Sequence, residues 1–206
     1  MKYATLQREW DSISTQYGAD KLLSIQWFGR LCDAYQAKRR CYHSLNHIEG
    51  MLGLANAHRG KISHRNSFYF ATWFHDAVMG FLSNSEQLSA NMCKKAMTEL
   101  GFPEAEIHKA CSLILATQCH QLSNDPDTQL FLDIDLASLG MSREHYMKYS
   151  LGCRREYLII PNWVYAFLRK RVLEELLRRE VIFQTKEFSN LEKMARINLE
   201  NEVLTL

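Results

Sequence analysis

Apolar residues recur at three- and four-residue spacing along most of the chain, a periodicity that predicts α-helices rather than strands. The first helix is expected over residues 3–17, and Gly18 separates it from a second helix that ends in the basic run 38–40. The stretch 181–183 has the composition of a strand, but an isolated strand would have no partner. We therefore predict an all-α bundle of roughly ten helices, with the others over 44–57, 66–76, 85–100, 104–120, 130–139, 142–160, 162–180 and 189–204.

Three of these helices carry predictions about packing. The helix over 66–76 is apolar on nearly every side, as expected of an element that runs through a core. The helix over 189–204 has an apolar face that permits a homodimer as readily as packing against the core. In the helix over 162–180, the apolar residues expected to point inward are Val164, Phe167, Leu168, Val172, Leu173, Leu176 and Leu177.

Composition limits the number of domains and the classes of partner. With 206 residues, 47% of them hydrophobic, the chain is suited to one domain spanning 1–206. Its net charge of +2 is too balanced for a nucleic-acid-binding surface. The short basic runs 38–40, 154–155 and 169–171 are expected to be solvated helix faces, with a local anion pocket as the alternative.

Cysteine usage and hydropathy indicate the compartment. The six cysteines show no CxxC spacing, and residues 1–10 contain no apolar signal core. No apolar run reaches the ~18 residues that a membrane span requires. We therefore expect free thiols, no membrane association and a cytoplasmic location.

The candidate chemistry begins at the adjacent pair His75–Asp76, which ends the apolar run 70–74. Burying an imidazole beside a carboxylate is costly unless both have partners, and a divalent cation satisfies both. The further donors that could complete such a site are His43 and His47 upstream and His120, Asp133 and Asp135 downstream. The other histidines, His58, His64, His108 and His145, are expected to be ordinary surface residues.

The order and sequence context of these donors resemble the HD superfamily of metal-dependent phosphohydrolases, and in particular a bacterial subgroup of predicted phosphohydrolases. Residues 42–48 (Tyr-His-Ser-Leu-Asn-His-Ile) resemble its Tyr-His-Asn-Leu-x-His-Ile signature, with Ser44 where Asn is usual. Residues 73–78 (Trp-Phe-His-Asp-Ala-Val) resemble its Trp-Phe-His-Asp-x-Val. Further similarities run to the C-terminus, at Thr117-x-x-His120, Asp133-x-Asp135-Leu136-x-x-Leu139-Gly140, Arg154-Arg155-Glu156-Tyr157 and Ala195-Arg196-x-Asn198-Leu199-x-x-Glu202.

The resemblance implies an HD-type helical bundle and assigns roles within it. Residues 1–40 would pack on a metal-site core of about 42–140, followed by C-terminal helices over 142–206. The implied metal ligands are His47, His75, Asp76 and Asp135, with Asp135 preferred over Asp133 because it directly precedes Leu136. His43 and His120 would bind phosphate, support the ligands or hold a second metal.

The implied activity is hydrolysis of a nucleotide or another small phosphorylated metabolite, with a divalent ion (Mn, Co, Mg, Ni, Zn or Fe) activating water. Asp76 and Glu86 are the candidate general bases, and His120 is a further catalytic candidate. His43, Arg154 and Arg155 are the candidate phosphate-binding residues, although the two arginines could equally form ion pairs with Glu156 or another carboxylate. The alternatives are a di-iron HD-fold oxygenase and a non-catalytic ligand-binding protein.

Overall fold

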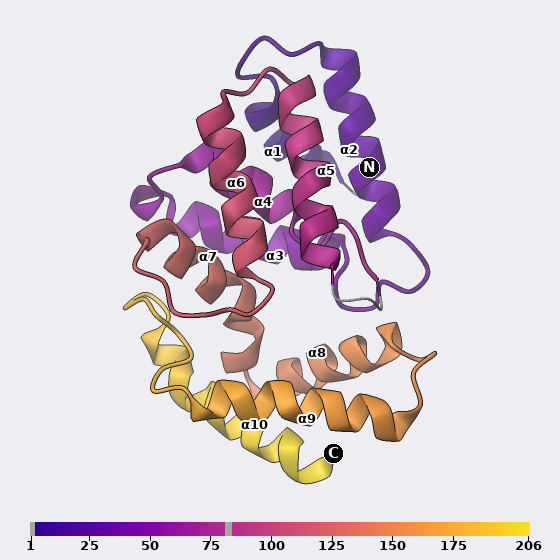
Figure 1. Ribbon diagram of the computed structural model, residues 1–206, viewed down its shortest axis with the longest axis vertical. Helices are drawn as coiled ribbons and strands as arrows, with labels where there is room; N and C mark the ends of the chain where they lie inside the picture. Colours follow the sequence, from indigo (N-terminus) through magenta and orange to yellow (C-terminus); the bar gives the residue numbers. More distant parts are fainter. Residues whose placement is uncertain (1–2, 81–83) are drawn as a thin grey trace.

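The computed structural model describes residues 3–80 and 84–206, and these residues are arranged as helices with no strand among them. The prediction of an all-α bundle of roughly ten helices is confirmed (Figure 1). The helices are α1 (Ala4–Ser14), α2 (Lys21–Tyr35), α3 (Leu45–Ala57), α4 (Arg65–Phe74), α5 (Ser85–Glu99), α6 (Glu104–Ala116), α7 (Pro126–Leu136), α8 (Arg143–Glu156), α9 (Asn162–Arg178) and α10 (Glu192–Thr205), with short 3-10 helices η1 (Arg59–Lys61), η2 (Ala137–Gly140) and η3 (Ser189–Leu191).

The boundaries differ from the predicted ones where side chains cap a helix. Helix α7 begins four residues before the predicted start at 130, because the Asp125 carboxylate accepts the Thr128 N–H at 2.8 Å and Pro126 suits a first turn. Residues 181–183 form no strand, because the N–H groups of Ile182 and Phe183 donate to the Glu192 carboxylate. The segment between the predicted helices over 66–76 and 85–100 is described at 77–80 and at 84, and its remainder lies outside the described residues.

Helix α4 runs through the centre of the molecule, as predicted. Each of its residues from Ser67 to Phe74 is buried. Helices α1 and α2 pack on it through aromatic rings: Trp10 lies 5.8 Å from Trp73 and Trp27 lies 6.0 Å from Phe74, measured between ring centroids. Helices α5 and α6 pack against each other and against α4. Because burying aromatic side chains is strongly stabilising, this packing holds the C-terminal end of α4 deep in the protein.

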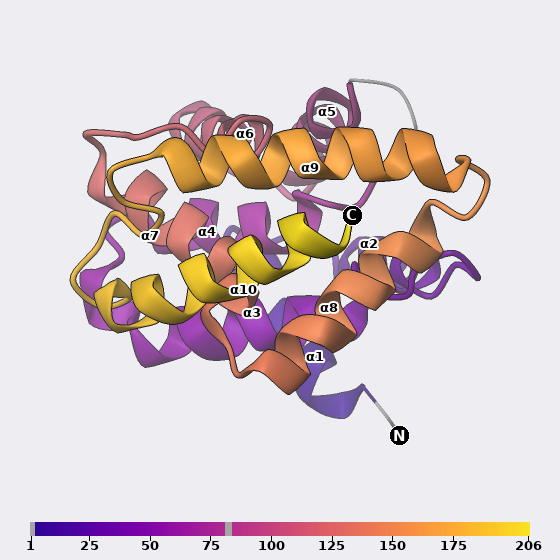
Figure 2. The same ribbon diagram turned by 90° about the horizontal axis from the view of Figure 1, so that it is seen from below.

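Helices α8, α9 and α10 lie together on one side of the molecule, below the others in Figure 1 and nearest the viewer in Figure 2. The Asn198 side-chain amide on α10 attaches this group by donating to the carbonyl oxygens of Leu139 and Met141, at 2.9 Å each. At Gly140 the backbone of η2 lies so close to Leu191 that a Cβ there would be 2.8 Å from the Leu191 carbonyl oxygen.

The predicted inward face of the helix over 162–180 is wrong at three of its seven residues. Leu173 and Leu176 are buried and Val164 and Leu177 partly so, but Phe167, Leu168 and Val172 are exposed. The physical reason is that α9 packs chiefly on α10, which covers only one side of it. In the C-terminal helix, Leu199 is fully buried whereas Met194, Ile197 and Leu204 are exposed.

None of the helices in the described parts of the chain is long and apolar enough to cross a membrane. The six cysteines are free thiols, as predicted, and Cys41 and Cys119 are exposed.

The close contact at Gly140 leads to a prediction about stability. Gly140→Ala should lower the free energy of unfolding by about 1–3 kcal/mol, because the new methyl group collides with Leu191. The matched control is Gly53→Ala on α3, where a Cβ meets nothing within 4 Å and a modest gain of about 0.5–1 kcal/mol is expected. Urea unfolding followed by circular dichroism measures both. Equal stability of the two variants would contradict this account of the η2–η3 contact.

Candidate metal centre

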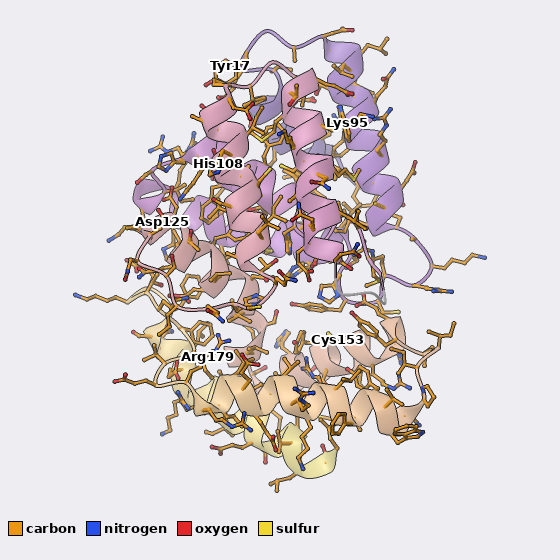
Figure 3. All side chains as sticks on the ribbon, viewed as in Figure 1. Tyr17, Lys95, His108, Asp125, Cys153 and Arg179 are labelled. Atoms are coloured by element: carbon orange, nitrogen blue, oxygen red, sulfur yellow. The ribbon has the colours of Figure 1, made fainter. Side chains whose placement is uncertain are left out.

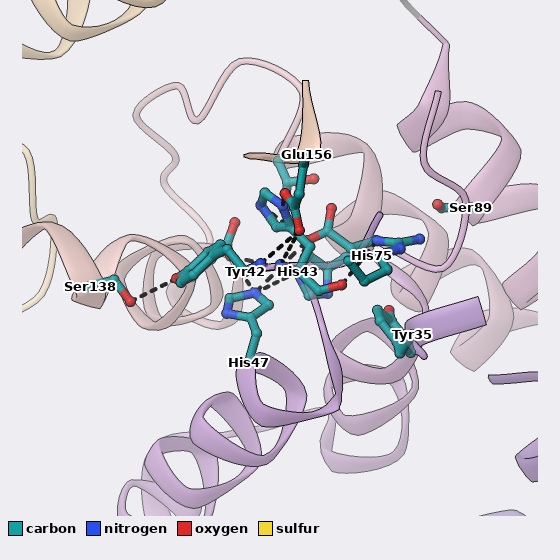
Figure 4. Close-up of polar contacts among 12 residues, drawn as sticks. Tyr35, Tyr42, His43, His47, His75, Ser89, Ser138 and Glu156 are labelled. Atoms are coloured by element: carbon teal, nitrogen blue, oxygen red, sulfur yellow. Dashed lines mark hydrogen bonds and ion pairs between the residues drawn. The ribbon is translucent and has the colours of Figure 1, made fainter. Parts of the chain in front are cut away.

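Three helices bring the predicted donors to one place. His47 lies in the first turn of α3, His75 and Asp76 directly follow α4, and Asp135 lies in the last turn of α7. Helix α3 packs against both α4 and α7, so it is the neighbour that the other two donor-bearing segments share. Figure 4 shows His47 and His75 approaching each other from different helices.

The donor atoms of the cluster lie close together. One atom from each of His47, His75 and Asp135 can be chosen so that all three are within 4.8 Å of one another. The Nε2 atoms of His47 and His75 are 3.2 Å apart, and they lie 3.3 and 3.6 Å from Asp135 Oδ1. Asp76 adds its Oδ2, which is 3.1 Å from His75 Nε2 and 3.8 Å from His47 Nε2.

Hydrogen bonding fixes which nitrogen of His75 faces the cluster. Its Nδ1 donates to the Thr72 carbonyl oxygen at 3.0 Å, so a neutral ring carries its lone pair on Nε2. That nitrogen is the one beside Asp76, Asp135 and His47. A backbone carbonyl on the opposite ring nitrogen is the usual way in which a protein orients a metal-binding histidine.

The site is arranged to hold positive charge. Burial opposes protonation of His75, but the charges of Asp76 and Asp135 and hydrogen bonds to them raise its pKa well above the ordinary value. Burial lowers the pKa of His47, and neighbouring carboxylates only partly offset this. Burial by itself would raise the pKa of Asp135, but the neighbouring histidines hold this pKa well below its usual range. Two carboxylates beside two imidazoles therefore favour a cation among them.

The donor spacing fits a single divalent metal ion. Two atoms bound to one ion at about 2.1 Å, with angles of about 90–130° between them, are roughly 3.0–3.8 Å apart. The distances within the cluster run from 3.1 Å for His75–Asp76 to 3.8 Å for His47–Asp76. Two imidazole nitrogens and two carboxylate oxygens suit Zn, Fe, Mn, Co or Ni better than Ca, which prefers oxygen donors alone.

His43 lies beside the cluster and is held by a buried glutamate from α8. Its Nδ1 is 2.6 Å from Glu156 Oε2, while its Nε2 lies 3.8 Å from Asp76 Oδ2. The other oxygen of Glu156 accepts the backbone N–H groups of residues 41–43, each at 2.8 Å (Figure 4). Burial opposes the charged form of His43, but Asp76 and Glu156 raise its pKa above the ordinary value.

His120 approaches the cluster from the other side. Its Nε2 lies 2.9 Å from Asp135 Oδ2, so Asp135 faces histidines with both oxygens. His120 has a φ of +47°, a left-handed conformation that residues other than glycine rarely adopt. Arg179, labelled in Figure 3, donates to the carbonyl oxygens of Cys119 and His120 and so holds this turn. Backbone strain of this kind is common where a side chain must be aimed.

A pocket of about 540 Å³ opens beside the cluster. Asp76, Asp135, His43 and His120 line it, and so does the third catalytic candidate, Glu86. Its wall also includes Arg40, a cation to which the sequence analysis gave no role in the site. The Arg40 guanidinium lies 5.2 Å from the Tyr35 ring centroid and donates to the carbonyl oxygens of His43 and Ala77.

Some predicted site residues lie elsewhere. The Arg154 guanidinium donates to the carbonyl oxygens of Tyr157 and Ile160 and to the Asn162 side chain, and so closes the C-terminal end of α8. Arg155 is exposed, and neither arginine lines the pocket. Glu156, considered as their ion-pair partner, pairs with His43 instead. Asp133 lies apart from the donor cluster, because its carboxylate accepts the N–H groups of Gln184 and Thr185.

From the sequence alone, Arg40 and Glu156 were given no role in the site, although the sequence position of each was informative. Arg40 stands three residues before His43 and was counted only within the basic run 38–40. Glu156 stands within one of the family-like segments but was given no role of its own. His64, expected to be an ordinary surface residue, is half-exposed and also pairs with a buried carboxylate, that of Asp127, at 2.8 Å.

Comparison of the chain with protein-family models, with curated proteins and with solved structures finds no match. The function of the site has to be inferred from its donor atoms and their surroundings. These atoms make three kinds of chemistry available beside one pocket: cation binding by the cluster, anion binding by Arg40, and proton transfer by His43, His120 and Glu86.

We predict that metal binding depends on Asp135 and does not depend on Asp133. The purified chain should bind divalent metal tightly, and Asp135→Asn should weaken binding by about 10–100-fold or more, because it removes a charged donor. Asp133→Asn should retain metal while losing about 1–3 kcal/mol of stability, because it weakens the contacts to Gln184 and Thr185. Mass spectrometry of bound metal and isothermal titration measure the first effect. If Asp133→Asn lost metal and Asp135→Asn retained it, Asp133 rather than Asp135 would be the metal ligand.

The second prediction concerns Glu156 and pH. Burial favours its neutral form, but hydrogen bonds from His43 and from the backbone N–H groups of Tyr42 and His43 lower its pKa below the ordinary 4.5. A depressed carboxyl pKa contributes stability above about pH 4.5, and that contribution is lost as the pH falls through the folded-state value. Glu156→Gln should therefore cost about 1–3 kcal/mol at neutral pH.

The cost of Glu156→Gln should shrink as the pH falls below about 4.5, since the native carboxyl then becomes neutral as well. Urea unfolding of both proteins across the pH range measures the difference in free energy of unfolding. A difference that stays constant with pH would show that the charge of Glu156 contributes nothing.

Proposed function

We propose that the protein is a metal-dependent phosphohydrolase that acts on a nucleotide or another small phosphorylated metabolite. The observation that carries this proposal is the His47–His75–Asp135 cluster, with Asp76 beside it, at a pocket that also contains Arg40, His43 and His120. A cation site next to a guanidinium and imidazoles suits a phosphoryl group, whose oxygens carry negative charge. The small net charge of +2 supports a small substrate over a nucleic acid.

His47, His75, Asp76 and Asp135 would hold the metal. A bound divalent ion lowers the pKa of water and polarises a phosphoryl oxygen. The chain must keep these four side chains fixed, and the Thr72 carbonyl does so for His75. His120 does so for Asp135 through the hydrogen bond to Oδ2.

Arg40 would neutralise the phosphoryl oxygens. Its guanidinium is fixed by the carbonyl oxygens of His43 and Ala77, at 3.3 and 3.1 Å, and by the ring of Tyr35. A guanidinium has five N–H donors, so these two bonds leave others for a substrate. A cation fixed before the substrate arrives costs little reorganisation during the reaction.

The reaction also requires two proton movements. As water attacks phosphorus, Asp76 or Glu86 would accept its proton, and both line the pocket. As the bond from phosphorus to the leaving oxygen breaks, His43 would donate a proton to that oxygen from Nε2. Glu156 suits His43 to this role, because it occupies Nδ1 and favours the charged ring.

A second candidate is the two-metal form of the site, on which a di-iron oxygenase would depend. The observation that favours it is the position of Asp135, whose Oδ1 faces His47 and His75 while its Oδ2 faces His120 at 2.9 Å. In that form His47, His75, Asp135 and His120 would be the residues that hold the two ions. Two tightly bound irons per chain, measured by mass spectrometry, would favour this candidate, and one exchangeable ion would count against it.

The test of hydrolysis is a panel of phosphomonoesters and phosphodiesters assayed with Mn²⁺, Co²⁺, Mg²⁺ and Ni²⁺. We expect turnover that falls at least about 1000-fold in His75→Ala, which loses a metal ligand. Arg40→Ala should lower kcat/KM about 10–1000-fold without loss of metal, because it removes a single charge contact to the phosphoryl group. The control is His108→Ala on the exposed surface of α6, which should retain activity.

Two results would contradict the proposal. One is absence of turnover for every ester and metal in protein that retains bound metal, which would favour a non-catalytic binding role. The other is turnover that survives His75→Ala, since the activity would then not depend on this cluster.

A further inference from the structure

Helix α9 and the turn before it expose several large apolar side chains. We call these residues the α9 apolar face: Leu158, Ile159, Trp163, Phe167, Leu168 and Val172, with 47–77% of each residue exposed. Trp163 and Phe167 are four residues apart, as are Leu168 and Val172, so the pairs form adjacent ridges along one helix. The other three tryptophans are at most 2% exposed, which sets Trp163, at 77%, apart.

The size of this face matches that of a protein interface. If each large side chain has about 200 Å² of surface, the exposed fractions of these residues together correspond to apolar surface on the order of 700 Å². The largest apolar patch on a typical monomer is about 300–600 Å², and a standard interface takes about 800 Å² from each partner. Tryptophan is among the residue types that contribute most to binding at interfaces, and phenylalanine is enriched there.

The charges around the face favour a protein partner over a membrane. Among and after the apolar residues, α9 carries charges of both signs: Lys170, Arg171 and Arg178 are positive, and Glu174 and Glu175 are negative. A further cation of α9, Arg169, is already paired with Glu202 of α10. Glu174 pairs with Arg178 at 3.4 Å. An anionic membrane surface would attract a uniformly basic helix and repel these glutamates. A mixed set of charges instead suits a second helix with the same pattern, because arginines of one copy can meet glutamates of the other.

We propose that the α9 apolar face is the interface with a second copy of this chain, packed as a twofold-symmetric pair of α9 helices. A twofold interface uses the same surface on both copies, which an apolar stretch followed by charges of both signs satisfies. Val172 belongs to this face and also lines the pocket beside the metal cluster. The partner would therefore lie at the rim of that pocket. The proposal stands independently of the reaction that the site carries out.

The experiment combines sedimentation velocity of the full chain over a range of concentrations with acrylamide quenching of tryptophan fluorescence. The dimer should dissociate on dilution, and quenching should rise in parallel, because Trp163 becomes accessible while Trp10, Trp27 and Trp73 stay buried. Phe167→Glu should raise the dimer dissociation constant about 100-fold or more and leave Trp163 quenchable at every concentration. Since Phe167 is exposed, circular dichroism should show an unchanged fold.

The matched control is Leu22→Glu, which places the same charge on a leucine that is 61% exposed at the start of α2. Figure 1 shows this end of α2 far from α9. The control should dimerise like the unmodified chain. A chain that is monomeric at about 100 µM, or a Phe167→Glu variant that dimerises normally, would overturn the proposal. Monomers whose Trp163 becomes protected on phosphatidylserine vesicles would overturn it in favour of a membrane surface.

Discussion

The cost of burying charge at the C-terminal end of α4 is the constraint on which the rest of this structure depends. His75 is 2% exposed, and two carboxylates lie within 3.6 Å of its Nε2. Such a group is stable only when positive charge is supplied among the oxygens, by a proton or by a metal. The aromatic packing of α1 and α2 on α4 places the cluster at this depth. Hydrophobic burial thus contributes the free energy that holds a costly polar site together.

Buried carboxylates also connect the C-terminal helices to this site. Glu156 of α8 accepts three consecutive backbone N–H groups before α3, and Asp133 of α7 accepts two N–H groups after α9. Glu192 of α10 does the same for Ile182 and Phe183. Each contact satisfies backbone donors of a loop that would otherwise be buried without partners.

The assignment of cationic residues shows where sequence inference is limited. Arg40 and Arg154 both stand in short basic runs near family-like segments, and sequence favoured Arg154. In the structure Arg154 closes its own helix, whereas Arg40 reaches the pocket wall. The choice depends on which carbonyl oxygens lie within reach of each long, flexible side chain. The distance between a side chain and these oxygens is set by how the chain packs, and the spacing of residues in the sequence does not specify it.

The sequence by itself determined the all-α class, the number of helices and the central position of α4, because periodicity records which sides of a helix avoid water. It also indicated that His75 and Asp76 require partners, since few side chains tolerate such burial without them. The family resemblance pointed to His47 and Asp135 among the candidates. Tertiary structure decided between Asp133 and Asp135, paired Glu156 with His43, and left Phe167 and Val172 exposed. Those outcomes depend on contacts between segments far apart in the chain, and local periodicity cannot specify which segments meet.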